Sequence, residues 1–174
     1  QFINNTQVKA NESVIKNIHQ KAHTSTSKHM HDWFTNNPNE WKEYHKQREL
    51  VKQTWEIDPV DVIAQEINSR NDVNKIADLG CGLAKLSTLV KKPNEVISVD
   101  HYSEDHNVIK ADIADLSTYI KDGEIDITVF CLSLWGINYL DYIKEAYRIT
   151  AKRGFMYIVQ PKENLSTMVS SEQK

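Results

Sequence analysis

The stretch that decides the fold is Ile76-Ala77-Asp78-Leu79-Gly80-Cys81-Gly82-Leu83-Ala84. Its apolar start predicts a short strand, its two glycines permit a tight turn, and the following residues through Val90 predict a helix. Ligands of open parallel sheets bind beyond the carboxyl ends of the strands, so this turn is a candidate binding site. Ala84 stands where a dinucleotide fingerprint has its third glycine, and no Lys-Ser/Thr pair follows, which disfavours a phosphate-binding P-loop.

The segments that follow alternate between strands and helices. Short apolar runs predict strands at 96–99, 108–111, 125–132 and 155–159, and the spacing over 139–149 predicts a helix that stops at Gly154. Strands that alternate with helices form βαβ units. We therefore expect an α/β fold, a Rossmann-like parallel sheet with helices on both faces, in a core over residues 75–160. The polar tail, residues 161–174, is expected to be flexible.

The residues before this core predict a helical appendage. Residues 1–31 are basic, and apolar residues between 14 and 22 recur at helical spacing, which indicates a short amphipathic helix followed by a linker over 24–27. Residues 32–74 form a helical lead-in. It contains one helix from Asn39 to Trp55 and a second that is capped by Asp58.

Composition excludes several classes of protein. The 174 residues suit one domain, and a net charge of −3 argues against a protein that coats nucleic acid by bulk charge. No run of about 18 apolar residues occurs, so we predict no membrane partner. The first ten residues lack the pattern of a secretory signal, and with only two cysteines we expect free thiols in a reducing compartment. We also predict no metal cofactor.

Three strand ends carry residues suited to an adenosine. Asp100 closes the second strand, twenty residues beyond Gly80, where a carboxylate can accept both hydroxyls of a ribose. Asp112 closes the third strand and could accept from an adenine amino group, while the N–H of Ile113 offers a donor. Together with the glycine turn, these residues predict an adenosine-type ligand.

This arrangement resembles class I S-adenosylmethionine-dependent methyltransferases. More narrowly, 76–83, 99–100, 129–138 and 141–148 resemble the nucleomethylin (ribosomal RNA-processing protein 8) family, and the resemblance covers about residues 20–160. It implies S-adenosylmethionine as cofactor, methylation of adenine N1 in large-subunit ribosomal RNA, ribosomal RNA or the pre-ribosome as partner, and a nucleolar or nuclear location. The implied cofactor contacts are His45, Gly80, Asp100, Asp112, Ile113 and Cys131.

Two of these contacts have simpler interpretations from the residues alone. His45 could be a solvent-facing helix residue and Cys131 a small buried hydrophobe. Adenine N1 needs no deprotonation, so we assign no general base. Trp135 could stack on a splayed adenine and Asn138 could recognise its edge, or they could cover the core and cap the next helix.

The substrate remains open at this point. Trp135 and Ile137, like Leu83, depart from the family pattern. RNA could contact residues 1–31 and a basic cluster in the lead-in, although such faces are more often merely solvated. That cluster is Lys42, Lys46, Arg48 and Lys52, interleaved with Trp41 and Trp55.

Other functions fit the same sequence. A methyltransferase of a small molecule or a protein and a non-catalytic cofactor-binding scaffold are the alternatives, and the resemblance also implies chromatin-silencing partners. The family's sheet has about seven strands and only five are found before Val159, so we expect missing C-terminal strands and an open sheet edge at the last strand.

Overall fold

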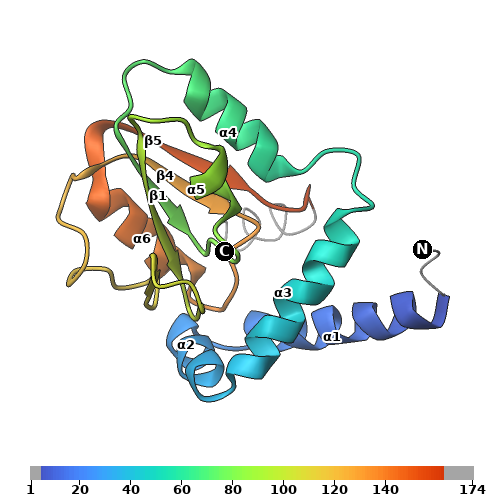
Figure 1. Cartoon of the computed structure of the whole chain (residues 1–174). Coiled ribbons are helices and arrows are strands. Elements are labelled where there is room, and N and C mark those ends of the chain that lie inside the picture. Colours follow the sequence, from blue (N-terminus) through green and yellow to red (C-terminus); the bar gives the residue numbers. More distant parts are fainter. Residues whose placement is uncertain (1–4, 163–174) are drawn as a thin grey trace.

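The computed structural model describes residues 5–162, with side chains from residue 13 onward. Five parallel strands form one sheet in the order β3-β2-β1-β4-β5. The strands are β1 (Lys75–Leu79), β2 (Glu95–Asp100), β3 (Val108–Lys110), β4 (Ile125–Cys131) and β5 (Thr150–Val159). This order places β2, β1 and β4 side by side, so that their carboxyl ends lie together at the same end of the sheet (Figure 1).

Helices cover both faces of this sheet, as the alternating pattern predicted. On one face α6 (Tyr139–Ile149) packs over a core that includes Phe130, which is fully buried. On the other face α4 (Pro59–Ser69) and α5 (Lys85–Leu89) cover a second core around Ile76. The predicted cap of α4 is confirmed, because Asp58 accepts a hydrogen bond from the Val60 N–H at 3.1 Å.

Three helices form a separate layer below the strand ends in Figure 1. They are α1 (Asn5–His23), α2 (Ser27–Asn36) and α3 (Pro38–Lys52). The amphipathic pattern of α1 is confirmed: Ile18 and Ala22 are buried in a third core with Trp41. We call these three helices, α1–α3, the roof.

Three expectations about the elements differ from the structure. The linker expected over 24–27 is one residue shorter, because Ser27 already begins α2 and Thr26 caps that helix by accepting from the His29 N–H. Helix α3 begins at Pro38 and ends at Lys52, before Trp55, since Pro38 takes the first helical position. Residue 154 does not stop a helix: α6 ends at Ile149 and β5 follows at once. At Gly154 a Cβ would lie 2.7 Å from the Asp126 carbonyl oxygen, so glycine permits close strand packing there.

The last strand leaves one edge of the sheet open. Among residues 5–162, β5 pairs with β4 alone, so the expected open edge is confirmed. Phe155 and Ile158 on this strand are 42% and 39% exposed. The guanidinium of Arg70 lies over the Phe155 ring, 4.0 Å from its centre. The expected flexible tail falls largely on residues 163–174, which lie outside the described part of the chain.

No helix among the described residues is long and apolar enough to cross a membrane.

Candidate functional site: a cofactor cavity at the strand ends

The glycine turn after β1 is shaped by two close neighbours. Gly80 and Gly82 have φ values of +80° and +57°, in the left-handed region that favours glycine. A Cβ on Gly80 would lie 2.4 Å from the Cβ of Ser133, and one on Gly82 would lie 2.9 Å from the imidazole of His45. The two glycines therefore let the β4–α6 loop and helix α3 both reach the end of β1.

Asp100 lies at the centre of the strand ends and is 7% exposed. One carboxylate oxygen accepts a hydrogen bond from the Gly82 N–H at 2.8 Å. The other accepts from the indole N–H of Trp41, also at 2.8 Å. Asp100 thus links β2, the glycine turn and the roof, and its oxygens retain further lone pairs for a ligand.

Asp112 and Ile113 lie one strand further along. One oxygen of Asp112 accepts from the Ala114 N–H at 2.9 Å, and the other accepts from the Ser27 hydroxyl at 3.0 Å. Ile113 is buried and lines the same cavity as Asp100. The structure therefore brings Ile113 and Asp100 to the same cavity, whereas Asp112, bonded to Ala114 and Ser27, does not itself line it.

His45 faces this cavity from helix α3 rather than pointing into solvent. Its ring lies against the Trp41 ring, with centres 4.2 Å apart, and against Gly82. Burial lowers the pKa of His45 to about 4, and the partly opposing charge of Asp100 does not compensate. The imidazole is therefore neutral at physiological pH.

Cys131 ends β4 and lines the cavity from the opposite side. Burial is the main reason that its pKa is raised to about 12, and burial raises the pKa of Cys81 well above its ordinary value too. Both cysteines are free thiols, as the sequence predicted. Neither is a thiolate nucleophile at neutral pH.

The cavity itself lies between the strand ends and the roof. Its volume is about 150 Å³. Gly80, Asp100, Ile113 and Cys131 line it from the sheet, while His45 and Met30 line it from the roof. The residues present fit an adenosine ligand: a buried carboxylate with spare lone pairs stands beside apolar walls, and His101 nearby has a buried Nδ1 without a hydrogen-bond partner.

Asp78 is a cavity residue that sequence reasoning missed. Its carboxyl group is buried at the end of β1, between the glycine turn and Cys131, and lines the cavity. Burial, reinforced by the negative charge of Asp100, raises its pKa to about 7. The signal was available, because an acidic residue in an otherwise apolar strand directly before a glycine turn is unusual for a buried strand.

The two candidates for base recognition lie on the β4–α6 loop in different surroundings. The Trp135 indole donates to the Leu132 carbonyl at 2.5 Å and packs against His19, with ring centres 4.2 Å apart. Asn138 is the N-cap residue of α6 but makes no side-chain cap bond. Its amide instead accepts from the Ser27 N–H at 2.9 Å and donates to the Ser27 hydroxyl, which ties α2 to α6.

The basic residues of the lead-in are largely paired with acids. Lys42 contacts Glu104 at 2.6 Å, and Lys52, only 13% exposed, contacts Asp58 at 3.1 Å. Lys46 lies 3.9 Å from Glu43, and Arg48 donates to the Tyr44 hydroxyl. Trp41 is buried, so it does not interleave with these cations at the surface. The structure does not gather the lead-in cluster into one unpaired basic surface.

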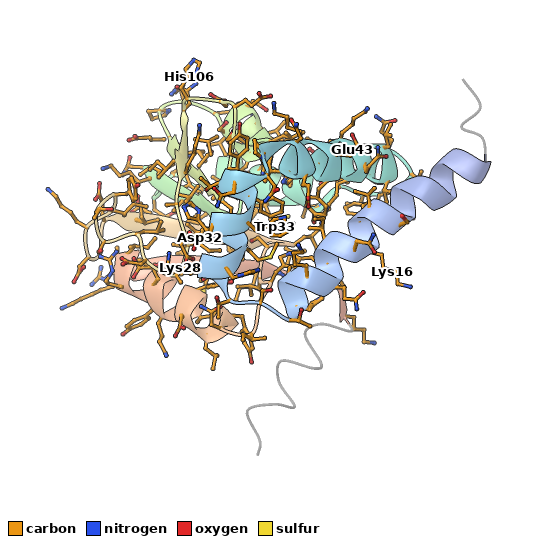
Figure 2. The ribbon with its side chains drawn as sticks, turned by 90° about the horizontal axis from the view of Figure 1, so that it is seen from below. Lys16, Lys28, Asp32, Trp33, Glu43 and His106 are labelled. Carbon is orange, nitrogen blue, oxygen red and sulfur yellow. The ribbon has the colours of Figure 1, made fainter. Side chains whose placement is uncertain are left out.

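Other lysines of the roof lie on its outer side. Figure 2 shows Lys16 on α1 and Lys28 on α2, on the same side of the molecule as Asp32 and Glu43. Lys28 and Asp32 form an exposed pair at 3.2 Å. Exposed ion pairs of this kind are weak, so these lysines can also contact other negatively charged groups.

Known proteins resemble this chain over most of its length. A family model described as "Hypothetical methyltransferase" matches residues 3–173. Ribosomal RNA-processing protein 8 of Dictyostelium discoideum is 34% identical over 143 residues, which are 82% of this chain and 36% of that protein. The Arabidopsis thaliana protein of the same name is 34% identical over 145 residues, 83% of this chain and 49% of the relative.

A third relative carries the name of an enzyme. It is the 25S rRNA (adenine(645)-N(1))-methyltransferase of Schizosaccharomyces pombe, 32% identical over 159 residues, 86% of this chain and 49% of the relative. The chain thus spans about half the length, or less, of these relatives. Because the family match takes in nearly the whole chain, this protein belongs to that methyltransferase family, as the resemblance to ribosomal RNA-processing protein 8 predicted.

Proposed function

We propose that this chain is the cofactor-binding and catalytic part of an S-adenosylmethionine-dependent methyltransferase that modifies N1 of an adenine in large-subunit ribosomal RNA. The observation that carries the proposal is the cavity at the carboxyl ends of β1, β2 and β4, with Asp100 buried at its centre. The names of relatives from three fungi, each a 25S rRNA adenine-N1 methyltransferase, support the reaction and the substrate.

In this proposal the residues around the cavity bind and orient the cofactor. Asp100 accepts the ribose hydroxyls through its spare lone pairs, and Asp112 with the Ile113 N–H recognises the adenine edge. Gly80 allows close approach of the backbone. His45 and Cys131 close over the part of the cavity furthest from the adenine. Bound there, S-adenosylmethionine would supply an electrophilic methyl group.

The chain's remaining task is alignment. Adenine N1 has a free lone pair at neutral pH, so no residue has to remove a proton from it. Positioning of the two reactants then supplies most of the rate enhancement. The neutral His45 and the high pKa values of both thiols agree with this proposal, since none of these three side chains is a strong base or an activated nucleophile.

A second cavity, of about 370 Å³, is the proposed place for the target base. It lies on the other side of Leu132 and Trp135, which line both cavities together with His19 and Arg48. Trp55 also lines it, and the surface is almost wholly apolar. An unstacked purine suits such a site, because the aromatic faces offer stacking and the Arg48 guanidinium in the cavity wall would attract the negatively charged RNA backbone.

Asn138 is a weaker candidate for base recognition than Trp135. Its amide already bonds to Ser27, so reading a base edge would require that bond to open. Its role in recognition stays a prediction. The proposed partner is ribosomal RNA or the pre-ribosome, in the nucleolus or nucleus. Nothing in the relatives' names supports a chromatin partner, so the proposal does not extend to one.

The proposal can be tested in two measurements. Calorimetry with S-adenosylhomocysteine should show binding by the intact chain and a loss of at least about tenfold in affinity for Asp100→Ala, which removes a buried charged acceptor. Asp122→Asn, at an exposed surface position, is the matched control and should bind like the wild type. Failure of the wild type to bind would refute the cofactor site.

The reaction is tested with ribosomal RNA fragments, followed by mass spectrometry of the nucleosides. The proposal predicts 1-methyladenosine. Binding of cofactor without transfer to any RNA would favour the non-catalytic scaffold, and transfer to a protein or small molecule would favour a different methyltransferase. Trp55→Ala should lower the yield of methylated RNA while leaving affinity for S-adenosylhomocysteine within about threefold, because Trp55 lines the second cavity and not the first, and a stacking loss of about 1–3 kcal/mol then falls on the base.

A further inference from the structure

Trp41 joins the roof to the proposed ribose site through one buried hydrogen bond. Its side chain is 3% exposed, and its indole N–H donates to Asp100 at 2.8 Å across 59 residues of sequence. An indole nitrogen can only donate, and a carboxylate oxygen can only accept. Trp41 is therefore always the donor of this bond, and the bond is lost when its N–H is removed.

The geometry of this bond fixes the Asp100 carboxylate. The Gly82 N–H holds one oxygen and the Trp41 N–H holds the other, so rotation of the carboxylate would break both bonds. The Trp41 ring cannot easily move, because it packs against His45 at 4.2 Å and edge-on against Tyr102 at 5.6 Å between ring centres. Each oxygen is left with a lone pair in a defined direction.

We infer that Trp41 is a positioning residue for ribose recognition: its N–H holds the Asp100 carboxylate in the orientation that accepts the ribose hydroxyls of the cofactor. This inference rests on the proposed function, because it takes the ligand to be an adenosine derivative. The inference also means that the roof contributes to the affinity for the ligand. Trp41 on α3 thereby sets, through Asp100, how well the sheet recognises the ribose.

Trp33 provides a matched control within the same roof. Its indole N–H also donates to a carboxylate, that of Glu40, at 3.0 Å. This bond lies at the surface and joins α2 to α3, away from the cavity. Removing it tests the loss of an indole–carboxylate bond without a change at Asp100.

The experiment compares two ligands and three proteins. Calorimetry measures binding of S-adenosylhomocysteine and of its 2′,3′-dideoxy analogue, which lacks both ribose hydroxyls, to the wild type, Trp41→Phe and Trp33→Phe. Trp41→Phe should bind S-adenosylhomocysteine about tenfold more weakly, since a hydrogen bond to a charged group is lost. The dideoxy analogue should bind the wild type and Trp41→Phe equally, and Trp33→Phe should match the wild type with both ligands.

A purely packing role for Trp41 gives a different pattern. Trp41→Phe would then weaken both ligands by the same factor, which would overturn the inference, as would unchanged binding of S-adenosylhomocysteine. Replacing Trp41 with 3-benzothienylalanine, in which sulfur takes the place of the N–H in a ring of similar size, repeats the test where Phe disturbs folding. A wild type that binds neither ligand would refute the proposed function and this inference together. Wild-type binding with no ribose-dependent effect would refute this inference alone.

Discussion

Asp78→Asn should stabilise the protein, and by an amount that depends on pH. Asp78 is buried at the end of β1, and its pKa is raised from 3.8 to about 7, first by burial and then by the charge of Asp100. The folded protein thus favours the protonated carboxyl group. Between pH 3.8 and about pH 7 the unfolded chain releases the Asp78 proton, while the folded protein keeps it. The free energy of unfolding of the wild type therefore falls as the pH rises through this window.

The magnitude follows from the two pKa values. With 3.8 in the unfolded chain and about 7 in the folded one, this carboxyl group costs roughly 3 kcal/mol more at about pH 8 than at about pH 4.5. Asparagine has nearly the same shape and no charge, so it escapes this cost. The advantage of Asp78→Asn should therefore grow by about that amount across the window and level off above the folded pKa.

Urea unfolding of both proteins at several pH values measures this difference, because titrating groups that do not interact with Asp78 cancel in the comparison. Asp32→Asn is the control, since Asp32 lies on the surface in an i,i+4 pair with Lys28, and its effect should stay within about 0.5 kcal/mol throughout. Parallel stability curves for the wild type and Asp78→Asn would show that Asp78 is charged in the folded protein, and would refute the reasoning.

Three further outcomes are expected. Gly82→Ala should lower the free energy of unfolding by about 1–3 kcal/mol in urea titrations, because a left-handed Ala is strained and its Cβ would press on the His45 ring, 2.9 Å away; an unchanged midpoint would contradict this. Glu145→Ala should cost about 2–4 kcal/mol by the same assay, since Glu145 is buried and accepts the Leu116 N–H at 2.6 Å, and a surface-like loss under 0.5 kcal/mol would argue against that bond. Cys131, with a pKa of about 12, should react with iodoacetamide at least about 100-fold more slowly than the same thiol in urea, as followed by mass spectrometry of peptides; equal rates would mean that the thiol is not buried.

The sheet could be predicted from sequence because its signals are local. β1, β2 and β4 are apolar runs next to turn residues, and Asp58 before Pro59 is a complete helix start in two residues. Each of these elements matches the structure within a residue or two. Local patterns are enough where the strand itself supplies the apolar surface that becomes buried.

Helix α2 was missed because its apolar face is too short to be seen alone. Met30 and Phe34 are its main buried side chains, and they are buried only because α1 and α3 lie against them. The start of β5 was missed for a related reason. Lys152 and Arg153 beside Gly154 are typical of a helix end, but pairing with β4 determines the strand.

The residues of the candidate site could likewise be predicted only where their signal is local. Gly80 and Asp100 follow from the order of strand and turn, whereas the bond between Trp41 and Asp100 joins residues 59 positions apart and has no local signature. The resemblance implied that His45 contacts the cofactor, and the structure places it in the cavity wall, whereas the helix pattern favoured a solvent-facing residue. Contacts between the roof and the sheet are set by tertiary packing, which one sequence does not display.

The exposed edge of β5 has a consequence for the behaviour of the chain in solution. A long edge strand presents unpaired N–H and C=O groups, and Phe155 and Ile158 add apolar surface beside them. Two copies can pair through such edges, so the chain should self-associate as its concentration rises. Arg70, whose guanidinium lies over Phe155, masks part of this surface. Light scattering over a dilution series would therefore define the concentrations at which ligand affinities belong to the monomer.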